Sequence, residues 1–249
     1  MKKKTIFILA IFCLIINTKG VAQKIDIGVE TGFSAFSIEM NDIDNIRDNS
    51  SFTYEGCVLD DVFSAGQRYN AGLKIDYLTP NNHFELSSGL RYSRMTKIVE
   101  NGSYFYFLIE TPQDVEYLRL TKIAQKSDYL GIPFDVKFFP RDEIHFFNQF
   151  FSLGTDFNFL INNKNDISYY KKEFNADDEV NKNIKDPGNF FGSVYAGIGF
   201  RFGKKDCFAT VIQAFFPCIY YTSSGSFGLV KPVAMEGAFV ELELRIPIK

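Results

Sequence analysis

Two histidines are the only imidazole side chains in this chain, and neither belongs to a recognisable catalytic motif. His83 and His145 lie in short segments between apolar runs. A general base must reach the group that it activates, and the sequence has no Gly-x-Ser-x-Gly nucleophile motif. Gly203-Lys204-Lys205 does not fit a phosphate-binding loop, because Ile198 stands where a glycine is needed and Lys205 where Ser or Thr is needed. We expect no enzymatic activity and no catalytic residue.

Acidic clusters are the next candidates for chemistry. Asp42 and Asp44 lie close together, as do Asp177, Asp178 and Glu179. Carboxylate oxygens are calcium ligands, but neither cluster has the spacing and central glycine of an EF-hand. The four cysteines form no Cys-x-x-Cys pair that would indicate zinc. Solvated loops are the favoured interpretation over calcium sites, and we expect no metal or cofactor.

The most informative charged residues alternate with apolar ones. Because successive side chains of a strand point to opposite faces, they should share one face of a sheet. Both signs are present, so they can pair in a narrow interior, where unpaired charges would be costly. We favour a structural ion network; a proton path through the barrel is the alternative. The expected network contains Asp26, Glu30, Lys74, Asp76, Glu85, Arg91, Asp135, Lys137, Asp156, Arg201, Glu241, Glu243 and Arg245.

Eight runs with this period-two pattern predict eight strands. They cover residues 25–35, 69–77, 84–92, 130–138, 147–161, 194–202, 207–221 and 238–248. The register of 207–221 is ambiguous, because both faces are apolar. Short connections rich in turn residues alternate with long ones. The short ones are 79–82, 140–145 and 203–206; the long ones are 40–66, 99–127, 162–189 and 222–234.

The segregation of loop lengths is typical of outer-membrane barrels, which have short periplasmic turns and long external loops. The fold class we predict is all-β: a single eight-stranded antiparallel transmembrane up-and-down barrel with three short periplasmic turns and four long external loops. Its runs are long enough to cross a bilayer, and aromatics lie at their ends, where membrane girdles occur. A soluble lipocalin-like carrier also alternates, with the apolar face inside.

One apolar stretch, Tyr104 to Ile109, falls in a predicted external loop. Either the flanking strands extend beyond the membrane as a protruding hairpin, or this segment docks a partner. Alternation continues from Val115 to Leu120, which favours the hairpin.

Composition sets the class and the compartment. The chain has 249 residues, 16% aromatic residues and a formal net charge of −3, which gives no basic nucleic-acid footprint. Residues 1–22 combine a basic start, a short apolar stretch and the sequence Gly-Val-Ala, which is typical of a cleaved secretory signal. Residues 23–249 would then form the barrel domain. Loss of Lys2, Lys3, Lys4 and Lys19 with the signal changes the net charge from −3 to −7.

Three cysteines remain after cleavage: Cys57, Cys207 and Cys218. The predicted topology puts Cys57 and Cys218 near the external side and Cys207 at the periplasmic end. Disulfide-bonded Cα atoms lie within about 7 Å, so Cys57–Cys218 is the reasonable pair if a disulfide forms. Three free thiols are an equal alternative.

A resemblance rests on the segment Tyr129-Leu130-Gly131-Ile132-Pro133. It resembles the Tyr-Leu-x-Ile-Pro strand of the outer-membrane β-barrel domain family, the PorT-like group of Bacteroidetes (porin-family small barrels). Phe151 to Gly154 and Ala196 to Gly199 stand where that family has its next glycine-containing strands, and the Val-Ala-Gln signal end is similar to exported proteins of that phylum. The resemblance implies the fold and an outer-membrane location, but no single activity.

We therefore expect a non-enzymatic outer-membrane barrel, envelope-structural or binding partners or ligands through its long external loops. A secretion- or transport-associated PorT-like role and a soluble lipocalin-like carrier are the alternatives. The expected partners are outer-membrane lipid and a protein at the external loops, with no nucleic acid, and the chain is expected to be a monomer.

Overall fold

A computed structural model describes residues 24–37, 46–47, 63–110, 115–141, 146–171, 176–204, 207–223, 227–229 and 238–248. Several sequence predictions lie outside these residues: the signal peptide, the Asp42–Asp44 cluster, Cys57 and His145. The side chain of Cys218 is also outside the description.

Nine strands and one short helix make up the described chain. They are β1 (Lys24–Ser37), β2 (Ile46–Arg47), β3 (Phe63–Leu78), β4 (Phe84–Glu110), β5 (Val115–Phe138), β6 (Phe147–Tyr169), α2 (Asp177–Asn183), β7 (Phe190–Phe202), β8 (Ala209–Thr222) and β9 (Phe239–Ile248). In the part of the chain that the structure describes, no helix is both long enough and apolar enough to cross a membrane.

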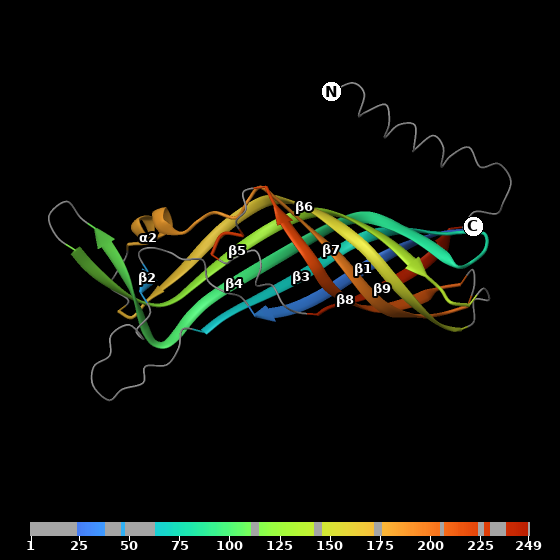
Figure 1. Ribbon diagram of the computed structural model, residues 1–249, viewed down its shortest axis with the longest axis horizontal. Coiled ribbons are helices and arrows are strands. Elements are labelled where there is room, and N and C mark those ends of the chain that lie inside the picture. Colours follow the sequence, from blue (N-terminus) through green and yellow to red (C-terminus); the bar gives the residue numbers. More distant parts are fainter. Residues whose placement is uncertain are drawn as a thin grey trace, which may run out of the picture.

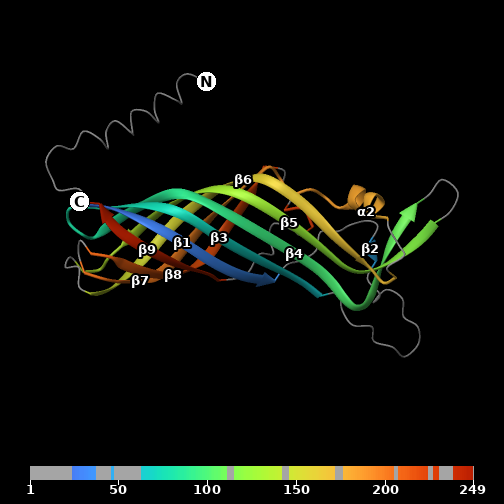
Figure 2. The same cartoon turned by 180° about the vertical axis from the view of Figure 1, so that it is seen from behind.

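The strands form one antiparallel sheet that closes into a ring. Its order is β2-β4-β3-β1-β9-β8-β7-β6-β5, and the pairing of β4 with β5 joins the two ends. Figures 1 and 2 show the strands tilted around a common axis. The two-residue β2 lies outside the ring and pairs with β4 at Phe107 and Tyr106. The all-β antiparallel barrel expected from alternation is confirmed.

Side chains alternate between a solvent-exposed outer face and a buried inner face. On β3, Leu73 is 59% exposed whereas its neighbour Lys74 is 0% exposed. The same contrast recurs on β9, where Leu242 and Leu244 are exposed and Glu241 and Glu243 are buried. Apolar side chains therefore cover the outside of the barrel, and charged side chains fill its inside.

Three strands are longer than the ring requires. β4, β5 and β6 have 27, 24 and 23 residues, and at one end they extend past the other strands (Figure 1). The segment 99–127, expected as a long connection, is mainly strand, because β4 runs to Glu110 and β5 begins at Val115. The alternative of a protruding hairpin therefore describes this segment correctly.

One bulge changes which residues of β6 point inward. Tyr129 pairs with Leu160 and Asp128 with Asn162, so Ile161 is an extra residue in β6. A bulge of this kind shifts the alternation on one strand only. On β6 the residues that point inward have even numbers up to Asn158. Beyond the bulge the inward residues have odd numbers, since Asn163 contacts the inward Ser127.

Candidate functional site

Glycines on the inner face make room for large charged side chains. Gly28 on β1 lies opposite Lys74 on one side and Arg245 on the other. A Cβ atom at Gly28 would overlap the Glu243 carboxylate. Gly154 has the same place between Asp135 and Tyr195. Because each glycine lies beside large side chains, a narrow eight-stranded interior can hold so many charged groups.

An upper network surrounds Lys74 near the middle of the lumen. Its Nζ lies 3.0 Å from Glu30 Oε2, 3.0 Å from Asp135 Oδ2 and 2.6 Å from Glu241 Oε1. Arg91 links two of these carboxylates, because its Nε contacts Glu30 at 2.5 Å and its Nη2 contacts Glu241 at 2.5 Å. Tyr195 donates a hydrogen bond to Asp135. We call Glu30, Lys74, Arg91, Asp135 and Glu241 the upper network.

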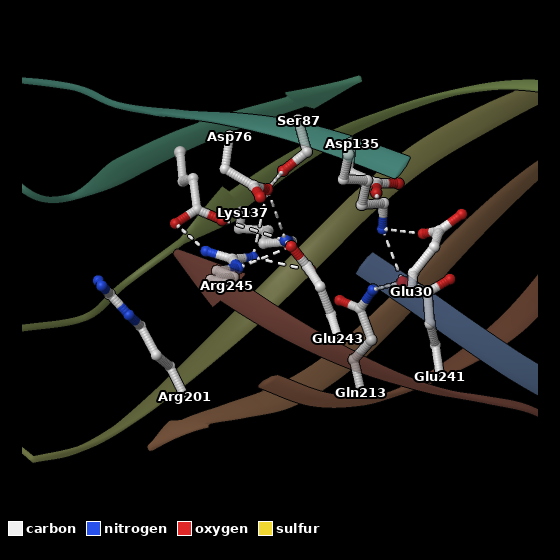
Figure 3. Close-up of polar contacts among 12 residues, drawn as sticks. Glu30, Asp76, Ser87, Asp135, Lys137, Arg201, Gln213, Glu241, Glu243 and Arg245 are labelled. Atoms are coloured by element: carbon white, nitrogen blue, oxygen red, sulfur yellow. Dashed lines mark hydrogen bonds and ion pairs between the residues drawn. The ribbon is translucent and has the colours of Figure 1, made fainter. Parts of the chain in front are cut away.

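A lower network surrounds Arg245, closer to the short turns. Arg245 Nε donates to Glu243 Oε1 at 2.8 Å, and its Nη1 donates to Glu85 Oε2 at 2.8 Å. Lys137 Nζ lies 3.0 Å from Glu85, 3.4 Å from Asp76 and 3.6 Å from Glu243. Asp76, Glu85, Lys137, Glu243 and Arg245 form the lower network. Figure 3 shows it beside Glu30, Asp135 and Glu241 of the upper network.

The remaining predicted residues lie at the two ends of these networks. Arg201 is 3.6 Å from Asp26 below the lower network. Asp156 lies on the other side, where its Oδ2 accepts a 2.8 Å hydrogen bond from Arg68 and its Oδ1 accepts one from the Ser193 hydroxyl at 2.6 Å. The structure thus brings all thirteen predicted network residues to the inner face.

Arg68 belongs to the lumen but was not predicted as a network residue. Its guanidinium lies 5.3 Å from the ring centroid of Phe191 and 5.6 Å from that of Phe239, within cation–π range. The signal was available, because the alternation of this run already puts Arg68 on the same face as Lys74 and Asp76.

Apolar clusters close the lumen at both ends. Leu78, Phe139, Phe150 and Val211 pack together at the end with the short turns. At the opposite end, residues from two long connections pack on the barrel wall: Val180 and Ile184 from α2 and its C-terminal end, and Phe227 and Leu229. We call residues 176–187 and 227–229 the cap. They contact inward residues that include Met95, Leu120, Ile123 and Phe191.

Polar contacts from the barrel wall hold the cap. Gln125 Oε1 accepts a 2.9 Å hydrogen bond from the Leu229 backbone N–H, and Gln125 Nε2 donates to the Lys185 carbonyl at 3.1 Å. Lys97 Nζ donates to the Phe227 carbonyl and lies 3.3 Å from Gln125 Oε1. None of the described carboxylates pairs with Lys97, and burial lowers the pKa of its ammonium to about 7.

Charged side chains occur on the outer face of β4 and β5 from Arg94 and Asp128 towards the cap. Arg94 Nε donates to Asp128 Oδ1 at 2.7 Å, and the Tyr92 hydroxyl donates to the same oxygen at 2.7 Å. These hydrogen bonds, with that of Arg94 the strongest influence, lower the pKa of Asp128 to about 2. Further along, Lys126 pairs with Asp166 at 2.5 Å. The outer face is thus apolar below Tyr92 and polar above it.

The apolar part of the outer face forms a continuous belt around the ring. On β4 it runs from Phe84 to Tyr92, and the next outward residue is Arg94. We call this surface the apolar belt; its exposed members include Ile27, Val29, Leu73, Ile75, Leu86, Leu90, Ile132, Phe134, Val136, Leu153, Ile198, Ile212, Phe216, Leu242, Leu244 and Ile246. Exposed aromatics lie near its borders: Phe33, Tyr69, Phe84, Tyr92, Phe138, Phe147 and Phe159.

The other sequence candidates have ordinary structural surroundings. His83 lies in a turn, where its Nδ1 is 3.0 Å from the Phe139 carbonyl oxygen. Asp177, Asp178 and Glu179 form the first turn of α2, where acidic residues favour a helix N-terminus. Cys207 is a free, exposed thiol. Within the described ranges, no group of three His, Cys, Asp or Glu side chains is placed to hold a metal ion.

Comparisons with known proteins found only distant structural similarity. No protein-family model matches this chain, and no curated protein matches its sequence. Among solved structures it is similar to the outer membrane protein OprG from Pseudomonas aeruginosa, at 11% identity and a TM-score of 0.37, covering 89% of this chain and 93% of that one. It is also similar to the transport unit of the autotransporter AIDA-I from Escherichia coli, at 10% identity and a TM-score of 0.26, covering 93% and 92%. Similarity this low says nothing about activity.

Proposed function

We propose that this protein is a non-enzymatic outer-membrane barrel that closes its own lumen and presents a folded external part to a protein or envelope partner. The observation that carries the proposal is the inverted burial of the barrel, with apolar side chains exposed outside and charged ones buried inside. Exposed apolar surface of this extent has to be covered, and the hydrocarbon of a bilayer would cover a closed ring from all sides.

The dimensions of the apolar belt support a bilayer as its surroundings. From Phe84 to Tyr92 the belt spans the ~9–11 residues that a tilted strand needs to cross a membrane. A closed ring leaves no unpaired strand edge within the belt, as hydrocarbon requires. A soluble lipocalin-like carrier would need the reverse, with apolar residues lining an inner cavity.

The interior favours a closed barrel over a conducting one. Two buried ion networks occupy the middle of the lumen, and apolar clusters occupy both of its ends. Eight-stranded barrels have an interior just wide enough for side chains. A secretion- or transport-associated PorT-like role needs a path through this interior, so it is the weaker proposal.

The external part supports a role in contact with a partner. β4, β5 and β6 continue beyond the apolar belt, β2 adds to β4, and the cap with α2 packs on this extension. Its outward side chains are charged, among them Lys126 and Lys164 with Asp166. We call this extension with β2 and α2 the external sheet, and we place the contact with a partner there.

Photo-crosslinking in the native cell envelope tests this proposal. A photoreactive residue at Lys126 or Lys164 should give discrete adducts, whereas one at Asn81, in a turn at the opposite end, should give none. Adducts from position 81 alone would contradict a partner at the external sheet. Stable, porin-sized conductance of the purified protein in planar bilayers would contradict the closed lumen and favour the transport-associated role.

A further inference from the structure

The lower network has more negative than positive groups. Asp76, Glu85 and Glu243 face Lys137 and Arg245, so three carboxyl groups share two cations. Every one of these side chains is 1% exposed or less. A buried, uncompensated charge is costly, and one group usually becomes neutral instead.

Neighbouring groups do not supply the missing positive charge. Arg201 lies 3.6 Å from Asp26, which is itself a carboxylate. The upper network has the same imbalance, because Glu30, Asp135 and Glu241 share Lys74 and Arg91. The charge deficit of the lower network must therefore be met within that network.

A contact between two carboxyl groups shows where neutralisation would fit. The Asp76 side chain lies within hydrogen-bonding reach of Glu243. Ionised carboxylates only accept hydrogen bonds, so such a contact is favourable when one of the two carries a proton. Asp76 Oδ2 is buried, and among the described residues it meets no hydrogen-bond donor as long as both groups are ionised. A proton on this oxygen would satisfy it and Glu243 together.

Ion-pair distances identify Asp76 as the group that holds the proton. Arg245 binds Glu243 through two hydrogen bonds of 2.8 and 3.0 Å and binds Glu85 at 2.8 Å. Its distance to Asp76 is 3.2 Å, and Lys137 is 3.4 Å away. Asp76 also lies directly opposite Asp26 on β1, and opposed like charges are unfavourable. The Ser87 hydroxyl donates a hydrogen bond to Asp76 Oδ1, which leaves Oδ2 as the site for the proton.

We propose that the lower network is a proton-binding site in which Asp76 carries a proton on Oδ2 at neutral pH and donates it to Glu243. The bound proton makes the network electrically neutral, with two carboxylates for two cations. Glu85 and Glu243 then act as the permanent counter-ions of Lys137 and Arg245. The proposal concerns the interior of the barrel and does not depend on what binds the external sheet.

Infrared spectroscopy of the folded wild-type protein tests the proposal directly. Aspartate labelled with heavy carbon in its carboxyl group should shift the C=O stretching band of a protonated carboxyl group at pH 7. In Asp76→Asn the intensity of this label-sensitive band should fall by one carboxyl group, and any part that remains would belong to another aspartate such as Asp135 of the upper network. A label-sensitive band of unchanged intensity in Asp76→Asn would assign the proton to another aspartate, and no label-sensitive band in the wild type would mean that Asp76 is ionised. Either result overturns the proposal.

Unfolding by urea supplies a second, independent readout. At pH 7, Asp76→Asn should keep the wild-type midpoint, because the amide resembles the protonated acid in shape and charge. The matched variant Glu85→Gln should lower the midpoint, because Glu85 binds both cations closely. Equal losses in the two variants would contradict the assignment. A wild-type midpoint that rises with added sodium while that of Asp76→Asn does not would show that a metal ion, not a proton, neutralises the network.

Discussion

Arg245 makes the shorter ion pairs of the two cations in the lower network, at 2.8–3.2 Å against 3.0–3.6 Å for Lys137. It contacts Asp76, Glu85 and Glu243, and each of these groups is buried. Breaking a buried ion pair by removing one partner leaves the other charge without compensation, which costs more than the pair itself contributes. At the scale of single residues, the stability of the lumen should therefore depend on its cations.

Removing the charge of Arg245 should destabilise the barrel strongly. Arg245→Gln leaves three carboxyl groups with Lys137 alone, and we expect a loss of about 3–5 kcal/mol in the free energy of unfolding. The measurement is urea unfolding in lipid vesicles, followed by heat-modifiable gel mobility. Lys126→Gln is the control, because its partner Asp166 is on the exposed external sheet and such pairs contribute about 0–1 kcal/mol. Similar losses in both variants would show that the network is not a buried one.

Because of Lys97, the packing of the cap on the barrel wall should depend on pH. Burial lowers the pKa of Lys97 from 10.5 to about 7, whereas exposure of the side chain restores the usual value. Between pH 7 and 10.5, Lys97 binds more protons when the cap is detached and the side chain is exposed than when the cap is packed on it. The free energy that holds the cap in place therefore increases with pH across this window and falls as the pH drops towards 7. A neutral amine has two N–H groups, which match the carbonyl oxygens of Phe227 and Gln125.

Hydrogen exchange of the Leu229 amide checks the role of Lys97. In the wild type, protection should increase from pH 7 to about 10.5, after correction for the intrinsic exchange rate. Lys97→Met should abolish this pH dependence. The cap and the adjacent wall also carry Arg68, Asp177, Asp178, Glu179, Lys182, Lys185 and Asp186. A slope that survives in Lys97→Met would assign the effect to one of these groups.

At the scale of elements, the cap depends on a close approach of one glycine to the barrel wall. Gly228 has a φ of 83°, and a Cβ atom there would overlap the Gln125 amide. A side chain at this position is therefore both strained and obstructed. The strands of the apolar belt do not depend on this contact.

Gly228→Ala should release the 227–229 segment and leave the barrel folded. We expect faster exchange of the Leu229 amide, since its hydrogen bond to Gln125 would be lost, with unchanged heat-modifiable mobility. Gly203→Ala is the matched control, because Gly203 also has a positive φ, of 142°, but lies in a turn at the other end. Unchanged Leu229 exchange in Gly228→Ala would contradict the close contact.

Alternation predicted the ring well because it is a local property of each strand. It placed Lys74, Glu243 and Arg245 on one face. Lys97 lies an even number of residues from Arg91 on β4, so alternation also implies that Lys97 points inward. The extra residue Ile161 limited this approach on β6, because a bulge reverses inward and outward positions without an obvious mark in the sequence. The cap was not predictable, since the contact between Gln125 and Leu229 joins residues 104 positions apart.

At the scale of the whole molecule, the chain combines three zones along one axis. The apolar belt surrounds two ion networks, and an apolar cluster closes the end with the short turns. The extensions of β4, β5 and β6, with β2 and α2, lie at the other end (Figure 1), and Figure 3 shows part of the networks between them. We propose that lipid covers the apolar belt. The proposed location of the protein and of its partner depends on this contact with lipid.

Depth-resolved fluorescence quenching tests this claim most directly, because the chain contains no tryptophan. A single Leu73→Trp variant puts a fluorophore on the apolar belt, and Lys164→Trp puts one on the external sheet. In vesicles, lipids with brominated acyl chains should quench Trp at 73 and spare Trp at 164, whereas aqueous iodide should do the reverse. Quenching of position 73 by iodide but not by brominated lipid would contradict the membrane barrel.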